Sequence, residues 1–298
     1  MPTGASDPGE SDPVELTVAP RPRDIGNFEV LRLLPVAQRR SVGPFVFLDQ
    51  MGPAMLAAGQ GMDVRPHPHI GLATVTYLFD GEIMHRDTLG SVQAIRPGDV
   101  NWMTAGSGIA HSERTPPELR GGGVKVFGIQ SWVALPKAQE ETAPGFFHHG
   151  AASLPELEAE GARIRIVAGT AYGARSPVAT FAETLYCDVA LAAGARLALP
   201  TEHEERALLP VSGQVRVAGR SVELGTLLVF RAGHPVAIEA ETEARLMLVG
   251  GEPLDGPRFM WWNFVSSSKD RIEQAKADWK AGRFGVVPGE HEFIPLPE

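Results

Sequence analysis

Cysteine, basic charge and long apolar runs are all scarce in this chain of 298 residues, and each scarcity excludes a class of protein. Cys187 is the only cysteine, so no intramolecular disulfide can form, and its apolar surroundings predict an inert core thiol. The formal net charge of −9 argues against direct binding to nucleic acid, whose phosphates need a basic surface. No apolar run reaches the length of a membrane span.

The N-terminal residues 1–13 are polar and rich in proline, glycine, serine and acids. Such a composition predicts a disordered lead-in. It lacks the basic and apolar regions of a signal peptide, so we expect a cytoplasmic protein with no membrane association.

Glycine and proline are abundant, with 33 and 25 residues, which is typical of short strands separated by many turns. The run LATVTYLF at residues 72–79 is β-branched and aromatic, and Asp80 and Gly81 supply a turn directly after it. Short strands at close, regular spacing predict an all-β sandwich or barrel.

The segments that resemble β-strands fall into two halves. We predict a first domain over residues 14–136, a connection with a helical turn near residues 154–160 over 137–161, and a second domain over 162–298. Strand, glycine turn and strand follow one another at residues 79–83 and again at 211–215, which suggests a diverged internal duplication.

One helix is predicted near the C-terminus. Ser267 can cap its first turn with Asp270 three residues on, and Gly282 suits its end. An apolar stripe along one face consists of Ile272, Ala275 and Trp279.

Two pairs of residues carry most of the chemical information: His67 with His69, and His111 with Glu113. Residues i and i+2 of a strand point to the same face, so two adjacent strands would aim three imidazoles and one carboxylate at one point. These groups suit a divalent transition metal and leave positions open for O2 or substrate. The alternative is a surface loop around His67 and a core histidine at 111.

Longer motifs extend this interpretation. Residues 61–69 look like the first cupin motif, in which a glycine and five residues precede His-x-His. HPHIGLATVTYL at 67–78 and WMTAGSGIAHSE at 102–113 together resemble pirins. The resemblance extends to QSWVALP at 130–136 and, more weakly, to GEPL at 251–254 and AGRF at 281–284.

The resemblance implies a bicupin: two antiparallel cupin-type β-sandwich (jelly-roll) domains with few short helices. The metal would lie in the first domain, with His67, His69, His111 and Glu113 as its ligands. Many pirins also carry a glutamate four or five positions after the second histidine, where this chain has Ala73 and Thr74. The carboxylate must then come from Glu113 alone.

Other residues near the site admit two interpretations. His85 could support the ligands or be an exposed strand histidine, and the second is the expectation. We expect His203 and residues 148–149 at the surface and the second half to be a degenerate cupin without a metal. Five further side chains could line an aromatic pocket or belong to the ordinary core, namely Tyr77, Trp102, Met103, Phe127 and Trp132.

The resemblance implies two functions. The first is a quercetin 2,3-dioxygenase that opens a flavonol with O2, with Glu113 as the base that accepts the 3-hydroxyl proton. Fe(II) is the expected metal because O2 chemistry favours it, while Ni, Co, Cu, Mn or Zn fit the same ligands. The alternative is a non-catalytic, iron-dependent regulator that binds a transcription factor or a metabolic enzyme.

Overall fold

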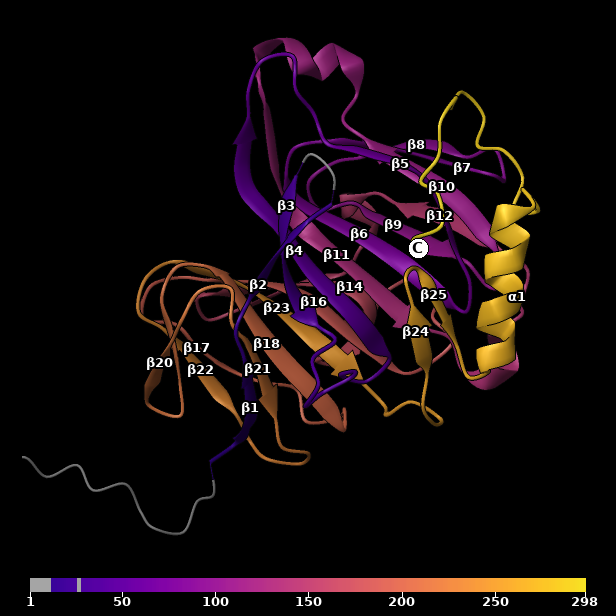
Figure 1. Ribbon diagram of the computed structural model, residues 1–298. Coiled ribbons are helices and arrows are strands. Elements are labelled where there is room, and N and C mark those ends of the chain that lie inside the picture. The colour runs from indigo at the N-terminus through magenta and orange to yellow at the C-terminus, as the bar shows by residue number, and fades with distance from the viewer. Residues whose placement is uncertain (1–11, 26–27) are drawn as a thin grey trace, which may run out of the picture.

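The computed structural model describes residues 12–25 and 28–298, and antiparallel strands form most of this part of the chain (Figure 1). The predicted all-β architecture with a C-terminal helix is confirmed. Residues 1–11 of the predicted lead-in lie outside the described residues. Asp12 is held in place, because its carboxylate accepts hydrogen bonds from Arg220 at 2.6 Å.

The first half of the chain consists mostly of strands. They are β1 (Val14–Val18), β2 (Arg21–Asp24), β3 (Glu29–Leu34), β4 (Phe45–Leu56), β5 (Asp63–His69), β6 (Leu72–Asp80), β7 (Ile83–Asp87), β8 (Val92–Ile95), β9 (Val100–Thr104), β10 (Ile109–Arg114), β11 (Val124–Ala134) and β12 (Gly145–His149). Short 3-10 helices occupy Pro117–Gly122, Lys137–Gln139 and Ala151–Ser153.

The second half continues with further strands and ends with a helix. Its elements are β13 (Glu156–Ala159), β14 (Ala162–Ala171), β15 (Ala174–Arg175), β16 (Thr184–Leu191), β17 (Arg196–Ala198), β18 (Glu205–Ser212), β19 (Val215–Val217), β20 (Arg220–Val222), β21 (Leu227–Phe230), β22 (Ala237–Ala240), β23 (Ala244–Gly251), β24 (Phe259–Trp261), β25 (Phe264–Ser266) and α1 (Lys269–Lys280). Among the described residues, no helix is long and apolar enough to cross a bilayer.

The two halves repeat one topology. The large sheet of the first half contains β9-β6-β11-β4-β3 in that order, and the large sheet of the second contains β21-β18-β23-β16-β14. The small sheets, β5-β10-β7-β8 and β17-β22-β19-β20, correspond strand for strand. This correspondence supports the predicted internal duplication.

The large sheets pack face to face, and this contact explains why the sequence of β6 is almost continuously apolar. Odd-numbered residues from 73 to 79 lie in the core that the two halves share, while Leu72 and Leu78 pack inside the first sandwich. A strand buried on both faces needs no polar alternation. Tyr77 also crosses the boundary, since its hydroxyl donates to Asp188 at 2.6 Å.

Each end of the chain packs on the opposite half. Strand β1 pairs with β21 in the large sheet of the second half. The hairpin β24–β25 and helix α1 instead pack on the first half, where Ile70 and Phe264 share a cluster with Ile272 (Figure 1). The domain divisions by residue number stay predictions, and these two exchanges tie the halves together.

Two local expectations were wrong. Residues 156–159 form strand β13 instead of a helical turn, because they pair with β14. The cap of α1 is Ser268, whose side chain accepts from the backbone amide of Arg271, while Ser267 hydrogen-bonds to the buried Glu140. The end at Gly282 is confirmed by its φ of 67°, a left-handed conformation that suits glycine.

The docking of the β24–β25 hairpin predicts a large effect of Gly71→Ala. Gly71 has a φ of 68°, and a Cβ there would lie 2.0 Å from the carbonyl oxygen of Val265. Gly233 has a similar φ of 71° with open space around it, so Gly233→Ala reports the backbone strain alone, about 1 kcal/mol. We expect Gly71→Ala to cost clearly more than this control in chemical unfolding. Equal losses would show that the close approach contributes nothing.

Candidate metal centre

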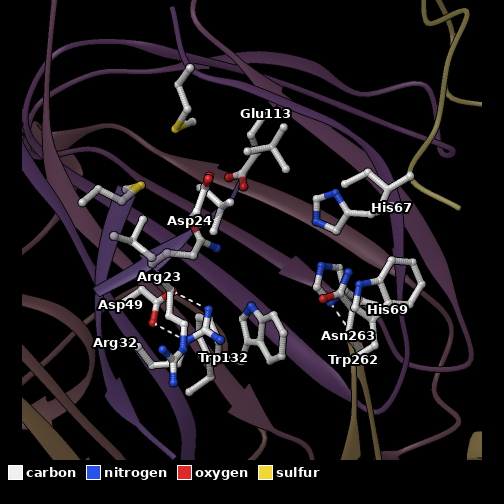
Figure 2. Close-up of a pocket in the computed structure, with 18 of the residues that line it drawn as sticks. Arg23, Asp24, Arg32, Asp49, His67, His69, Glu113, Trp132, Trp262 and Asn263 are labelled. Atoms are coloured by element: carbon white, nitrogen blue, oxygen red, sulfur yellow. Dashed lines mark hydrogen bonds and ion pairs between the residues drawn. The ribbon is translucent and has the colours of Figure 1, made fainter. Parts of the chain in front are cut away.

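A cavity of about 570 Å³ opens between the two sheets of the first half. Figure 2 shows His67 and His69 on one side of it, charged residues of β2, β3 and β4 on the other, and Trp132 between them. The β24–β25 hairpin closes the histidine side with Trp262 and Asn263. The site therefore lies inside the first sandwich, as the sequence predicts, but its wall includes a distant segment.

The pairing of β5 with β10 brings the predicted ligands together. His67 lies opposite His111, and Glu113 lies opposite Val64. The register shifts between these pairs, so residues 65–66 form a β-bulge. The bulge changes the alternation of β5, and Val64 and His67 both line the cavity although they are three residues apart.

Two prolines flank His67 at positions 66 and 68. They are tolerated because β5 is an edge strand of its sheet, where one side of the backbone has no neighbour to pair with. The free side is used at Pro66, whose carbonyl accepts from the amide of Ile294 at 2.8 Å. The C-terminal segment thus covers the edge that carries the ligands.

Three imidazoles converge in this cavity. One ligand atom from each of His67, His69 and His111 lies within 4.8 Å of the other two, and all three side chains are buried. Within residues 12–25 and 28–298 this is the only group of three or more histidine, cysteine or acidic residues with that geometry.

The hydrogen bonds of the rings fit a metal. His67 Nδ1 lies 2.9 Å from the carbonyl of Arg65, and His69 Nδ1 lies 3.2 Å from the carbonyl of Asn263. A carbonyl only accepts, so Nδ1 of each ring donates and Nε2 keeps a lone pair. His69 Nε2 and His111 Nε2 are 3.1 Å apart. Two nitrogens about 2.1 Å from one ion lie roughly 3 Å apart at right-angle coordination.

Glu113 lines the same cavity but lies outside the three-histidine group. Its Oε1 accepts from the hydroxyl of Thr76 at 2.8 Å, and the same hydroxyl lies 2.9 Å from Oε1 of Gln130. Glu113 as a fourth ligand therefore stays a prediction.

Burial governs the protonation of these groups. Burial lowers the pKa of His67 to about 4, although the hydrogen bond to the carbonyl of Arg65 acts in the opposite direction. Burial also holds the pKa values of His69 and His111 well below the ordinary range. The rings are therefore neutral, the form that binds metal. Burial raises the pKa of Glu113, although Thr76 opposes the shift.

The expectation that His85 is exposed was wrong. It is 3% exposed, and Nδ1 of its ring lies 3.3 Å from Nδ1 of His111. Strand β7 pairs with β10 so that His85 lies opposite Glu113. Its spacing to Asp87 repeats the i, i+2 pattern of the ligand pairs, and this was the available sequence signal.

Of the five side chains considered for an aromatic pocket, only Trp132 lines the cavity. Its ring stacks on Phe47 at 4.0 Å and meets the ring of His69 edge-on at 5.1 Å. Tyr77 and Trp102 belong to the core between the halves, as the alternative interpretation expected. Sequence reasoning missed Phe47 and Trp262, which complete the aromatic wall.

The remaining histidines lie away from this cavity. His203 was expected at the surface but is buried, with its Nε2 2.7 Å from the carbonyl of Thr170. In the second half, the strands that correspond to β5 and β10 are β17 and β22. They place Leu197 and Ile238 in an apolar core. No second group of ligands occurs among the described residues.

The geometry predicts that His69→Ala removes most of the bound metal while the fold survives. One of the three converging imidazole ligands is lost, so the ion is bound much more weakly. Elemental analysis of purified protein measures the metal per chain, and circular dichroism measures the fold. His291→Ala, at an exposed histidine, is the control. Unchanged metal content in His69→Ala would disprove the site.

The lowered pKa values predict how the metal-free protein responds to acid. The unfolded chain binds a proton at His67 near pH 6.5, whereas the folded chain does so only near pH 4. Stability therefore falls with pH in this window, by roughly 2 kcal/mol between pH 7 and pH 5 for this residue. Chemical unfolding at both pH values should show that His67→Gln removes this share, while His291→Gln does not. Equal pH dependence in all three proteins would contradict the burial of a neutral ring.

Comparison with known proteins agrees with the geometry. A family model described as Pirin matches residues 27–133, and one described as the pirin C-terminal cupin domain matches residues 186–285. A pirin-like protein of Caulobacter vibrioides is 53% identical over 96% of this chain and 100% of its own length. A Pseudomonas aeruginosa protein with the provisional name quercetin 2,3-dioxygenase is 41% identical over 87% of this chain and 82% of its own.

A solved structure shows the same architecture. The crystal structure of quercetin 2,3-dioxygenase from Acinetobacter baumannii superimposes with a TM-score of 0.89 at 34% identity, and the match covers 95% of both chains. The two sandwiches are thus cupin domains, as the first motif predicted. The chain belongs to the pirin family.

Proposed function

We propose that this protein is a metal-dependent dioxygenase that opens a flavonol such as quercetin with O2. The observation that carries the proposal is the convergence of three neutral imidazoles on one point of an open cavity. The names of the Pseudomonas and Acinetobacter relatives support the substrate class. We place the enzyme in the cytoplasm.

His67, His69 and His111 would hold the metal, with Glu113 as the fourth ligand. Fe(II) is our first choice, and Ni, Co, Cu, Mn or Zn would fit the same donors. When bound, the metal would lower the pKa of the flavonol 3-hydroxyl and support its reaction with O2, which opens the ring with loss of carbon monoxide.

The protein side chains would bind the substrate and move one proton. Trp132, which stacks on Phe47, offers a flat aromatic ring beside His69, and this suits the planar rings of a flavonol. Glu113 would accept the proton of the 3-hydroxyl. Burial raises its pKa and so favours the protonated form, and the hydroxyl of Thr76 donates to its Oε1.

The test is anaerobic loading of the metal-free protein with each candidate metal, followed by quercetin in aerated buffer. We expect oxygen uptake at an electrode together with release of carbon monoxide. His69→Ala, loaded in the same way, is the control for metal-dependent turnover. No oxygen uptake with any of these metals would reject the enzyme and favour the iron-dependent regulator.

Glu113→Gln extends the same experiment. If Glu113 is the base, its loss should lower kcat by roughly 10²–10⁴-fold. The metal content of the variant tells whether the carboxylate is also needed to retain the ion. Full activity in Glu113→Gln would contradict both roles.

A further inference from the structure

His111 differs from the two other predicted histidine ligands in the group that its Nδ1 contacts. Nδ1 of His67 and of His69 faces a backbone carbonyl, which can only accept a hydrogen bond. Nδ1 of His111 instead faces a side chain, the ring of His85, at 3.3 Å. An imidazole nitrogen can donate or accept, so the orientation of this contact depends on what lies behind His85.

Asp87 lies behind His85 and determines that orientation. Its Oδ2 is 3.0 Å from Nε2 of His85, and its Oδ1 accepts from the backbone amides of Leu89 and Ser91 at 2.9 and 3.0 Å. The carboxylate is fully buried and only accepts. Nε2 of His85 therefore donates to Asp87, and a ring with this single proton offers the lone pair of Nδ1 to His111.

The remaining proton positions follow in sequence. Because Nδ1 of His85 accepts, Nδ1 of His111 must donate. Nε2 of His111 then carries the lone pair, and this atom faces Nε2 of His69 at 3.1 Å in the cavity. The hydrogen-bonded row Asp87–His85–His111 thus sets the tautomer of the third ligand.

The position of His85 is fixed independently of these hydrogen bonds. Its ring stacks on Phe146 with the centroids 4.3 Å apart and an angle of 15° between the planes. The β7–β10 pairing places Asp87 opposite His111, and Phe146 comes from β12 of the other sheet, so both sheets fix the whole row. A ring fixed in this way cannot turn aside to release His111.

We infer that His85, supported by Asp87, is a positioning residue that presents Nε2 of His111 to the metal. The inference rests on the metal site of the proposed function and adds to it a residue outside the ligand set. Partners of ligating histidines typically contribute 10–100-fold to metal affinity, so roughly this share is expected from His85.

The test compares His85→Leu with His85→Gln. Leucine removes the acceptor for His111, whereas the glutamine carbonyl can accept from His111 while its amide donates to Asp87. Titration with Co(II) against a competing chelator, followed by the cobalt absorption spectrum, should show a loss of affinity of roughly 10–100-fold in His85→Leu and recovery in His85→Gln. His203→Leu, at a buried histidine far from the cavity, should bind Co(II) like the wild type.

A second measurement needs no variant and no metal. Nitrogen-15 NMR of the metal-free wild type should show a proton on Nδ1 of His111 and none on Nε2. A proton on Nε2 would overturn the inference, as would Co(II) affinity in His85→Leu equal to the wild type, or weak binding in a stably folded His85→Gln. Absence of Co(II) binding by the wild type would reject the metal site itself. Metal binding without flavonol turnover would reject the enzyme and leave this inference intact.

Discussion

The pairing of β5 with β10 is the constraint on which the site depends. It sets His67 opposite His111 and His69 opposite Ile109, so the imidazoles meet from two strands. The bulge at residues 65–66 then lets Val64 line the cavity as well. A slip of one residue in this register would turn an entire ligand pair to the opposite face of the sheet. The cavity, the aromatic wall and the proposed chemistry all presuppose this single alignment.

The sequence could predict the parts of the site that share a strand. The spacing of His67 and His69 fixes a common face on any strand, and the confirmed sandwich needs little more than short strands and turns. The sequence could not predict the contacts that join distant segments. Asn263 is 194 residues from His69, whose ring it orients, and nothing local marks that contact. His85 was misjudged for a related reason, since its burial follows from pairing with β10 and from the ring of Phe146.

The second half shows what the same topology becomes without a site. Strands β17 and β22 correspond to β5 and β10, yet they place Leu197 and Ile238 inside the sandwich, where apolar contacts replace the cavity. The fold therefore does not require a metal, and one copy is free to serve as support. That support is physical. The shared core between the large sheets buries one face of β6, and the other face carries the Thr76 that donates to Glu113.

The arrangement of lone pairs explains why the first half keeps buried polar side chains that lower the stability of the metal-free fold. With Nδ1 of each ring donating, Nε2 of His69 and Nε2 of His111 face each other at 3.1 Å with no hydrogen between them. Two acceptors at this distance repel each other. Adding a proton would create a buried charge, which the lowered pKa values oppose. A divalent cation satisfies both nitrogens at once, so the polar interior that weakens the empty fold is the same feature that selects a metal.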